Sequence, residues 1–170
     1  MRTNRFDPEK ALNAILWIAK RIQSPTFHSI SKMLYFADRF HLERYGRLIT
    51  GDSYVAMKNG PVPSGAYDIM KAVRGDGACV VEQDAQDAFT VVGNHEVSPR
   101  RKADDTLFSE SDIECLQEAV RQYGKLGFTE LTRISHDAAW NSADENDTIE
   151  LEQIIATFPD GEHLLEHLRR

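Results

Sequence analysis

The stretch from Phe27 to Tyr45 constrains the fold more than any other part of the sequence, because helix signals lie at both of its ends. Thr26 can cap a helix with its side-chain oxygen, and Gly46 suits the left-handed position that ends one. At about 100° per residue, apolar side chains cover about half of the circumference. These side chains are Phe27, Ile30, Met33, Leu34, Phe36, Ala37, Phe40 and Leu42. An arc this wide predicts a central hydrophobic helix that packs on more than one neighbour.

A second amphipathic run precedes this helix. Asp7-Pro8 is a helix-start pattern, and the periodicity predicts a helix from about Pro8 to Ile22. Its apolar side holds Ala11, Leu12, Ile15, Leu16, Ile18, Ala19 and Ile22. Trp17 lies on the opposite, polar side, which allows two interpretations of its role. Either it is an exposed anchor for a partner, or another element such as the C-terminal segment buries it.

The middle of the chain predicts short strands and turns. We expect a strand around 53–58, a rigid loop at 59–63 that Pro61 and Pro63 stiffen, and a helix from about Ser64 to Val73. Further β-type stretches lie around 78–82, 88–92 and 95–98, and Gly93-Asn94 suits a hairpin turn. These stretches predict a small antiparallel sheet.

The last third returns to helical patterns. Ser109 and Asp112 have capping-box spacing before a helix that ends near Gly124, and Thr129 can cap another through His136. Two short helices, around 150–157 and from 162 to the end, lie in a C-terminal tail at 149–170, after a polar loop at 141–147. With 41% hydrophobic and 28% charged residues, the pattern predicts one mostly helical α+β domain over 1–170.

Charge and cysteine content narrow the function classes. The chain has 27 acidic and 20 basic residues, a net charge of -7, so broad nucleic-acid binding is disfavoured. That charge either attracts a basic partner or serves solubility. Cys79 and Cys115 have no disulfide or metal-ligand spacing, which fits a reducing cytoplasm. The longest apolar run near the N-terminus, 14–19, is too short for export or membrane insertion.

Motifs for catalysis are weak. His163, Glu166 and His167 match a zinc-peptidase pattern, but they lie at the end of the chain without a third ligand downstream. His41 falls within an apolar arc, which favours a hydrogen-bonded core histidine. Ser135, His136 and Asp137 are adjacent, and consecutive helical side chains point about 100° apart, so they predict no triad. We expect no catalytic residues, no metal and no cofactor.

The run from Lys32 to Lys71 closely resembles the signature region of the Panacea domain, also called the SocA-like antitoxin domain. The matching pieces are 32–37, 46–52 and 60–63, with a Ser-His…Trp stretch further on. The motif residues are Lys32, Leu34, Tyr35, Phe36, Gly51, Asp52, Gly60, Pro61, Pro63, Ser135, His136 and Trp140. The resemblance covers about 11–140, and the β region and the tail match loosely.

This resemblance implies a bacterial, phage-borne or prophage antitoxin. Such a protein neutralises a cognate toxin encoded next to it by direct protein–protein binding, not by catalysis. Some relatives instead are adaptors that deliver a toxin to a cytoplasmic protease. Other members carry an additional DNA-binding segment. With few residues before Asp7, we expect none at this N-terminus and no transcriptional control.

Candidate partner-binding residues come from two regions and from the central helix. They are Trp17, Tyr35, Arg39, Gly60, Pro61, Val62 and Pro63. The 60–63 segment is either a preorganised contact loop or a structural piece that sets the angle between strand and helix. Two rival functions stay open. One is a winged-helix-like DNA binder, although Lys32 and Arg39 are balanced by acidic neighbours; the other is an enzyme that uses His41 or His136.

Overall fold

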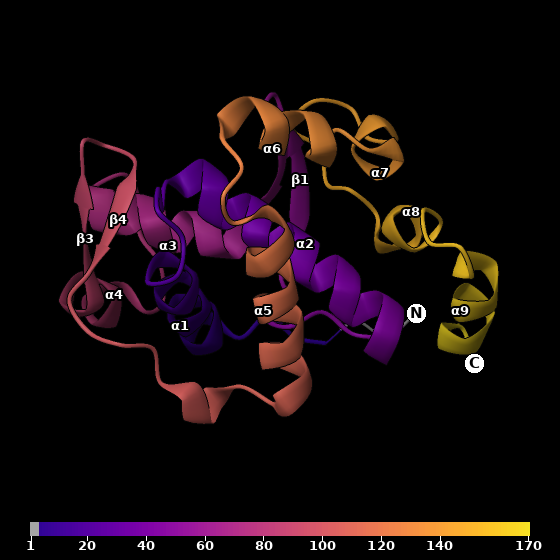
Figure 1. Cartoon of the computed structure of the whole chain (residues 1–170), viewed down its shortest axis with the longest axis horizontal. Helices are drawn as coiled ribbons and strands as arrows, with labels where there is room; N and C mark the ends of the chain where they lie inside the picture. Colours follow the sequence, from indigo (N-terminus) through magenta and orange to yellow (C-terminus); the bar gives the residue numbers. More distant parts are fainter. Residues whose placement is uncertain (1–3) are drawn as a thin grey trace.

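Helix α2 (Phe27–Tyr45) runs through the middle of the molecule, and the other elements surround it (Figure 1). The structure is a computed structural model and describes residues 4–170. Thr26 Oγ1 accepts from the Ser29 amide at 3.0 Å, and the Ser29 hydroxyl accepts from the Thr26 amide at 2.9 Å. Gly46 ends the helix at φ 75°. Both predicted ends of the central helix are therefore confirmed.

The remaining elements confirm a mostly helical α+β domain with two small antiparallel sheets. In chain order they are α1 (Pro8–Ala19), β1 (Tyr54–Met57), β2 (Gly60–Pro63), α3 (Ser64–Arg74), α4 (Glu82–Ala88), β3 (Phe89–Val92), β4 (Glu96–Pro99), the 3₁₀ turn η1 (Asp105–Leu107), α5 (Glu110–Tyr123), α6 (Phe128–Ser135), α7 (Ala138–Asn141), α8 (Leu151–Ile155) and α9 (Gly161–Leu168). Helix α5 lies alongside α2, and α8 and α9 extend toward one end of the molecule (Figure 1).

The predicted loop at 59–63 is wrong, because 60–63 forms strand β2. It pairs antiparallel with β1, so that Tyr54 faces Pro63 and Met57 faces Gly60. On its other side β1 bonds to 146–149, through the Ala56 and Ile149 amides among others. Proline lacks an N–H, and strands tolerate it at sheet edges. Since β1 is paired on both sides, β2 lies at the edge of the sheet. Pro61 and Pro63 are tolerated there.

The second sheet is partly as predicted. Strands β3 and β4 form a hairpin whose turn residues Gly93 and Asn94 have φ values of 60° and 67°. Positive φ at both positions is typical of the tight turn that fits strand twist. The strand expected at 78–82 is wrong, because the chain turns there and enters α4. Ala85 and Ala88 are buried three positions apart, which is a helical spacing.

Trp17 is 2% exposed, so it is a core residue and not a surface anchor. Every residue of α1 from 11 to 19 is buried, although one side of the helix reads as polar. One turn before Trp17, the Asn13 side chain accepts from the Asp104 amide at 2.8 Å and from Arg101 at 3.0 Å. The Arg21 guanidinium lies 3.8 Å from the centre of the Trp17 ring. Arg21 therefore covers part of the Trp17 ring, and the 101–104 segment contacts Asn13 one turn away on α1.

The C-terminal half contains the expected helices with small differences in their ends. Helix α5 has the predicted capping box of Ser109 and Asp112, and α6 begins at Phe128, one residue before Thr129. The short helix α7 lies just before the predicted loop at 141–147 and overlaps it at Asn141. Residues 163, 166 and 167 are exposed on α9, and no group of side chains in residues 4–170 could hold a metal ion. No helix within that range is long and apolar enough to cross a membrane.

Candidate functional site

The motif residue Lys32 is buried in the middle of the fold, at 1% exposure. Its ammonium group donates to the Pro61 carbonyl at 2.9 Å. Burial lowers the pKa of Lys32 from its usual value to about 7, because the charged form loses hydration. The central helix and strand β2 therefore meet at a buried amine.

Gly60 permits this close approach. Its φ is 116°, and a Cβ at this position would lie 2.6 Å from Lys32 Cε and 2.5 Å from Ser135 Oγ. No side chain fits there without moving its neighbours, and non-glycine residues avoid that backbone conformation. The fold thus brings together three motif residues that lie far apart in the sequence.

Asp137 connects the central helix to the 135–140 part of the motif. The Tyr35 hydroxyl donates to its Oδ2 at 2.7 Å, and Arg39 Nη1 lies 3.3 Å from the same oxygen. Its Oδ1 accepts from the Trp140 amide at 2.9 Å and so caps α7. Burial, followed by the charge of Asp137, raises the pKa of Tyr35. The sequence analysis considered Asp137 only within the adjacent Ser135-His136-Asp137 run, although Asp is a preferred N-cap residue.

His136 and Trp140 form a stacked pair with ring centres 3.9 Å apart. The Trp140 indole donates to the Met57 carbonyl at 2.8 Å, which attaches α7 to the β1–β2 hairpin. The Ser135 hydroxyl donates to the Thr132 carbonyl. No hydrogen bond joins residues 135, 136 and 137 to one another in the described chain, as expected from their adjacency.

The other motif positions serve the framework. Asp52 accepts from the amides of Ser53, Gly65 and Ala66 at 2.8 to 2.9 Å and so holds the start of α3. Gly51 has φ 73°, and a Cβ there would lie 2.5 Å from the Arg5 carbonyl oxygen. Leu34 and Phe36 are each 4% exposed and belong to the core.

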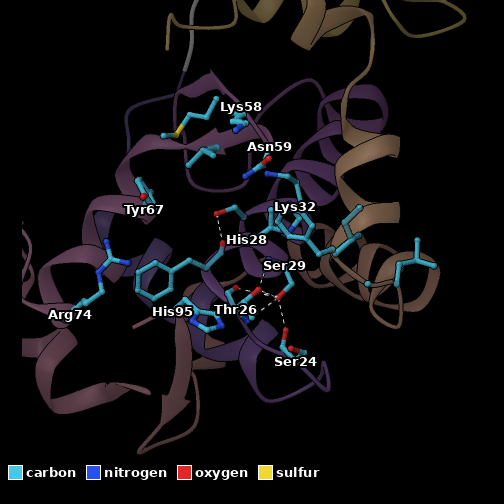
Figure 2. A pocket seen from close by; sticks show the side chains of 18 residues that line it. Ser24, Thr26, His28, Ser29, Lys32, Lys58, Asn59, Tyr67, Arg74 and His95 are labelled. Atoms are coloured by element: carbon cyan, nitrogen blue, oxygen red, sulfur yellow. Dashed lines mark hydrogen bonds between the residues drawn. The ribbon is translucent and has the colours of Figure 1, made fainter. Parts of the chain in front are cut away.

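A pocket of about 550 Å³ opens beside Lys32 (Figure 2). Its walls come from the start of α2, the β1–β2 turn, α3, the start of α6 and His95. His28 lies inside it, with Nε2 3.0 Å from Thr132 Oγ1 and its ring 4.2 Å from that of Phe128. Burial, with the charge of Lys32, lowers the pKa of His28 to about 4, so its imidazole is neutral at pH 7.

The two histidines considered as catalysts differ in their surroundings. His41 is fully buried, with Nδ1 2.9 Å from the Arg47 carbonyl and Nε2 2.8 Å from Ser111 Oγ. The prediction of a hydrogen-bonded core histidine is confirmed. His136 is half-buried, and its Nε2 has no hydrogen-bond partner within residues 4–170.

Most of the candidate partner-binding residues lie in the interior. Trp17, Tyr35, Gly60, Pro61 and Pro63 are buried. Val62 is half-buried and lines the pocket, and Arg39 is half-buried and bonds to Thr157 Oγ1 at 2.8 Å. Of the proposed contact loop, only Val62 therefore lines a pocket that a ligand can enter.

Comparison with known proteins gives one match. Searches of curated proteins and of solved structures found no similar protein. The sequence profile of the family described as antitoxin SocA-like, Panacea domain, matches residues 30–141. This range runs from the first turns of α2 to the end of α7 and contains Lys32, Gly60 and the 135–140 stretch. The chain therefore belongs to the antitoxin SocA-like, Panacea domain family.

Proposed function

We propose that this protein is an antitoxin that neutralises a toxin encoded next to it by direct protein–protein binding in the cytoplasm. The observation that carries the proposal is the family match over residues 30–141. The matched range contains all the residues that line the pocket except those before residue 30. The family name indicates an antitoxin domain, and a toxin partner follows from it.

The use of the motif's polar groups supports binding over catalysis. Tyr35 and Ser135 each donate a hydrogen bond within the chain, and Asp52 accepts from amides at the start of α3. Groups used in this way hold the framework. A general acid or base needs a proton path to a substrate, and none of the described residues that line the pocket with His28 is a carboxylate.

The net charge supports a basic partner. An acidic chain attracts a basic toxin, such as one that acts on RNA, and long-range attraction raises the association rate. Salt would reduce that rate, whereas a charge that serves only solubility would leave it unchanged. Association measured at low and at high salt therefore tests this part of the proposal.

Co-expression tests the function. The neighbouring gene product is expressed alone, with this chain, and with an unrelated antitoxin as control, while growth is scored and complexes are recovered on a tag. We expect growth arrest with the neighbour alone, rescue by this chain only, and recovery of both proteins together. An unrescued arrest with no complex would overturn the proposal.

The same experiment separates the alternatives. If rescue depends on loss of the toxin protein and disappears in a protease-deficient host, the chain is an adaptor for a cytoplasmic protease. If rescue depends on lowered toxin transcript and the purified chain binds the operon's promoter at moderate salt, it is a DNA-binding regulator. Stable toxin protein in a complex favours direct neutralisation.

A further inference from the structure

We infer that the pocket beside Lys32 receives a peptide segment of the partner protein in which a carboxylate lies next to an apolar side chain. The inference rests on the proposed function, because it names the contact through which the toxin would be held. Three features of the pocket carry it: an incompletely paired buried amine, basic walls and an exposed aromatic rim.

When protonated, Lys32 is an ammonium group without an anion among the described residues. It has three N–H donors, and within residues 4–170 it makes one hydrogen bond, to the Pro61 carbonyl. No ion pair of the described chain includes it, although its side chain is buried. Without an anion, burial favours the neutral amine, and an anion with further hydrogen bonds would stabilise the ammonium form. A carboxylate that enters the pocket would supply both.

The walls of the pocket are basic on an acidic protein. They include Lys32, Lys58 and Arg74, and no Asp or Glu is among the described residues that line the pocket. Arg74 is paired with Asp76 at 2.6 Å. Lys58, which is exposed at the β1–β2 turn, has no ion pair in the part of the chain that is described. An anionic segment therefore finds complementary charge here, while the net charge of -7 repels it from the molecule as a whole.

The rim of the pocket is apolar. Phe128 is 56% exposed, and Met57, Val62, Leu126 and Leu131 also line the cavity. Exposed aromatic rings at the edge of a cavity are typical of protein-binding surfaces. A volume of about 550 Å³ holds one or two side chains of a partner. Figure 2 shows Lys58 and Asn59 at one edge of this space and Lys32 and His28 facing it.

A purely structural role would account for Lys32 less well. Residues of similar volume without charge, such as Met, pack in a buried site without the cost of dehydrating an ammonium group. The Pro61 carbonyl holds the amine at the wall of the pocket, where an incoming carboxylate reaches it. The position of the amine therefore favours recognition.

The first test uses the full chain and a matched pair of peptides, acetyl-Phe-Asp-amide and acetyl-Phe-Asn-amide. Amide shifts in ¹⁵N-labelled protein report where each peptide binds. We expect the Asp peptide to shift Lys58, Asn59 and Phe128, and to bind about 5-fold or more tightly than the Asn peptide. Lys32→Met should remove this preference, and Lys20→Met, at an exposed site outside the pocket, should keep it. Equal binding of both peptides, shifts elsewhere, or no shifts at millimolar peptide would overturn the inference.

The second test uses rescue from the toxin. Phe128→Ser and Lys58→Glu change exposed rim residues, and Val80→Ser, at a 92% exposed site, is the matched control. We expect toxin binding to be about 10-fold weaker in the rim variants. Binding by the control variant should be unchanged. If the wild-type chain rescues growth and the rim variants bind equally well, the proposed function stands and this inference fails. If the Asp peptide binds but the chain never rescues, the pocket stands and the proposed function fails.

Discussion

The Tyr35 hydroxyl donates a 2.7 Å hydrogen bond to Asp137 Oδ2, across a sequence separation of 102 residues. Through it the buried middle of α2 is joined to the residue that caps α7. The same carboxylate interacts with Arg39, which also bonds to Thr157. Asp137 and Arg39 together therefore connect the central helix, the start of α7 and the C-terminal region.

Tyr35→Phe should lower the free energy of unfolding by about 1–2 kcal/mol, because the half-buried Asp137 Oδ2 loses its shorter hydrogen bond and keeps only Arg39 at 3.3 Å. Urea denaturation measures this loss. Tyr45→Phe is the control, since that hydroxyl bonds to Glu114 at a site 50% exposed and should cost under about 0.5 kcal/mol. Equal losses in both variants would show that the Tyr35 bond contributes nothing particular.

Gly60→Ala should destabilise the protein by about 2 kcal/mol or more, because its Cβ would collide with Lys32 and Ser135 at a positive φ. Gly75→Ala is the matched control, since Gly75 has φ 102° and open space around its Cα. Its cost is backbone strain alone, about 1–2 kcal/mol. Thermal melting of both variants compares the two, and an equal drop would contradict the close approach at Gly60.

Trp17→Ala should cost about 3–5 kcal/mol of stability, because the ring is buried in α1 and its removal leaves a cavity. Partner binding measured on the folded fraction should stay unchanged. Val80→Ala, at a 92% exposed site, controls for loss of an apolar side chain at the surface. A stable Trp17→Ala variant with weakened partner binding would restore the surface-anchor interpretation.

Asp38 should make stability depend on pH. It accepts from the Ile49 amide at 2.7 Å and from the Tyr54 hydroxyl at 2.6 Å, and burial raises its pKa to about 7. Between about pH 4 and pH 7 the folded protein holds a proton on Asp38 that the unfolded chain has lost. Stability from this group is therefore full below pH 4 and declines as the pH rises toward 7.

Asp38→Asn keeps an acceptor for the Ile49 amide and removes the titration. We expect the unfolding free energy of the wild type minus that of the variant to fall from pH 4 to pH 7, as measured by urea titrations. The comparison isolates Asp38 from His28, whose lowered pKa acts in the opposite direction. A difference that stays constant over this range would show that Asp38 is ionised throughout.

Local signals predicted the elements that depend on neighbouring residues. Helix α2 begins after Thr26 and ends at Gly46, and Ser109 and Asp112 cap α5. Gly93-Asn94 forms the hairpin turn. Each of these features arises within a few residues, so the sequence alone determines it. The same local pattern placed His41 inside an apolar arc, and the structure confirms its burial.

Tertiary structure decided what lies against each element. The sequence places Trp17 on the polar side of α1, but the ring is buried and Arg21 lies over it. The sequence predicts a loop at Pro61 and Pro63, but these residues form a strand because β1 pairs with them. Burial and strand pairing depend on which distant segments arrive, and periodicity within one element carries no information about them. The close approach of Gly60 to Lys32 and Ser135 likewise depends on segments that are far apart in the sequence. The sequence supplied these motif residues, and only the fold brought them into contact and placed Lys32 at the wall of the pocket.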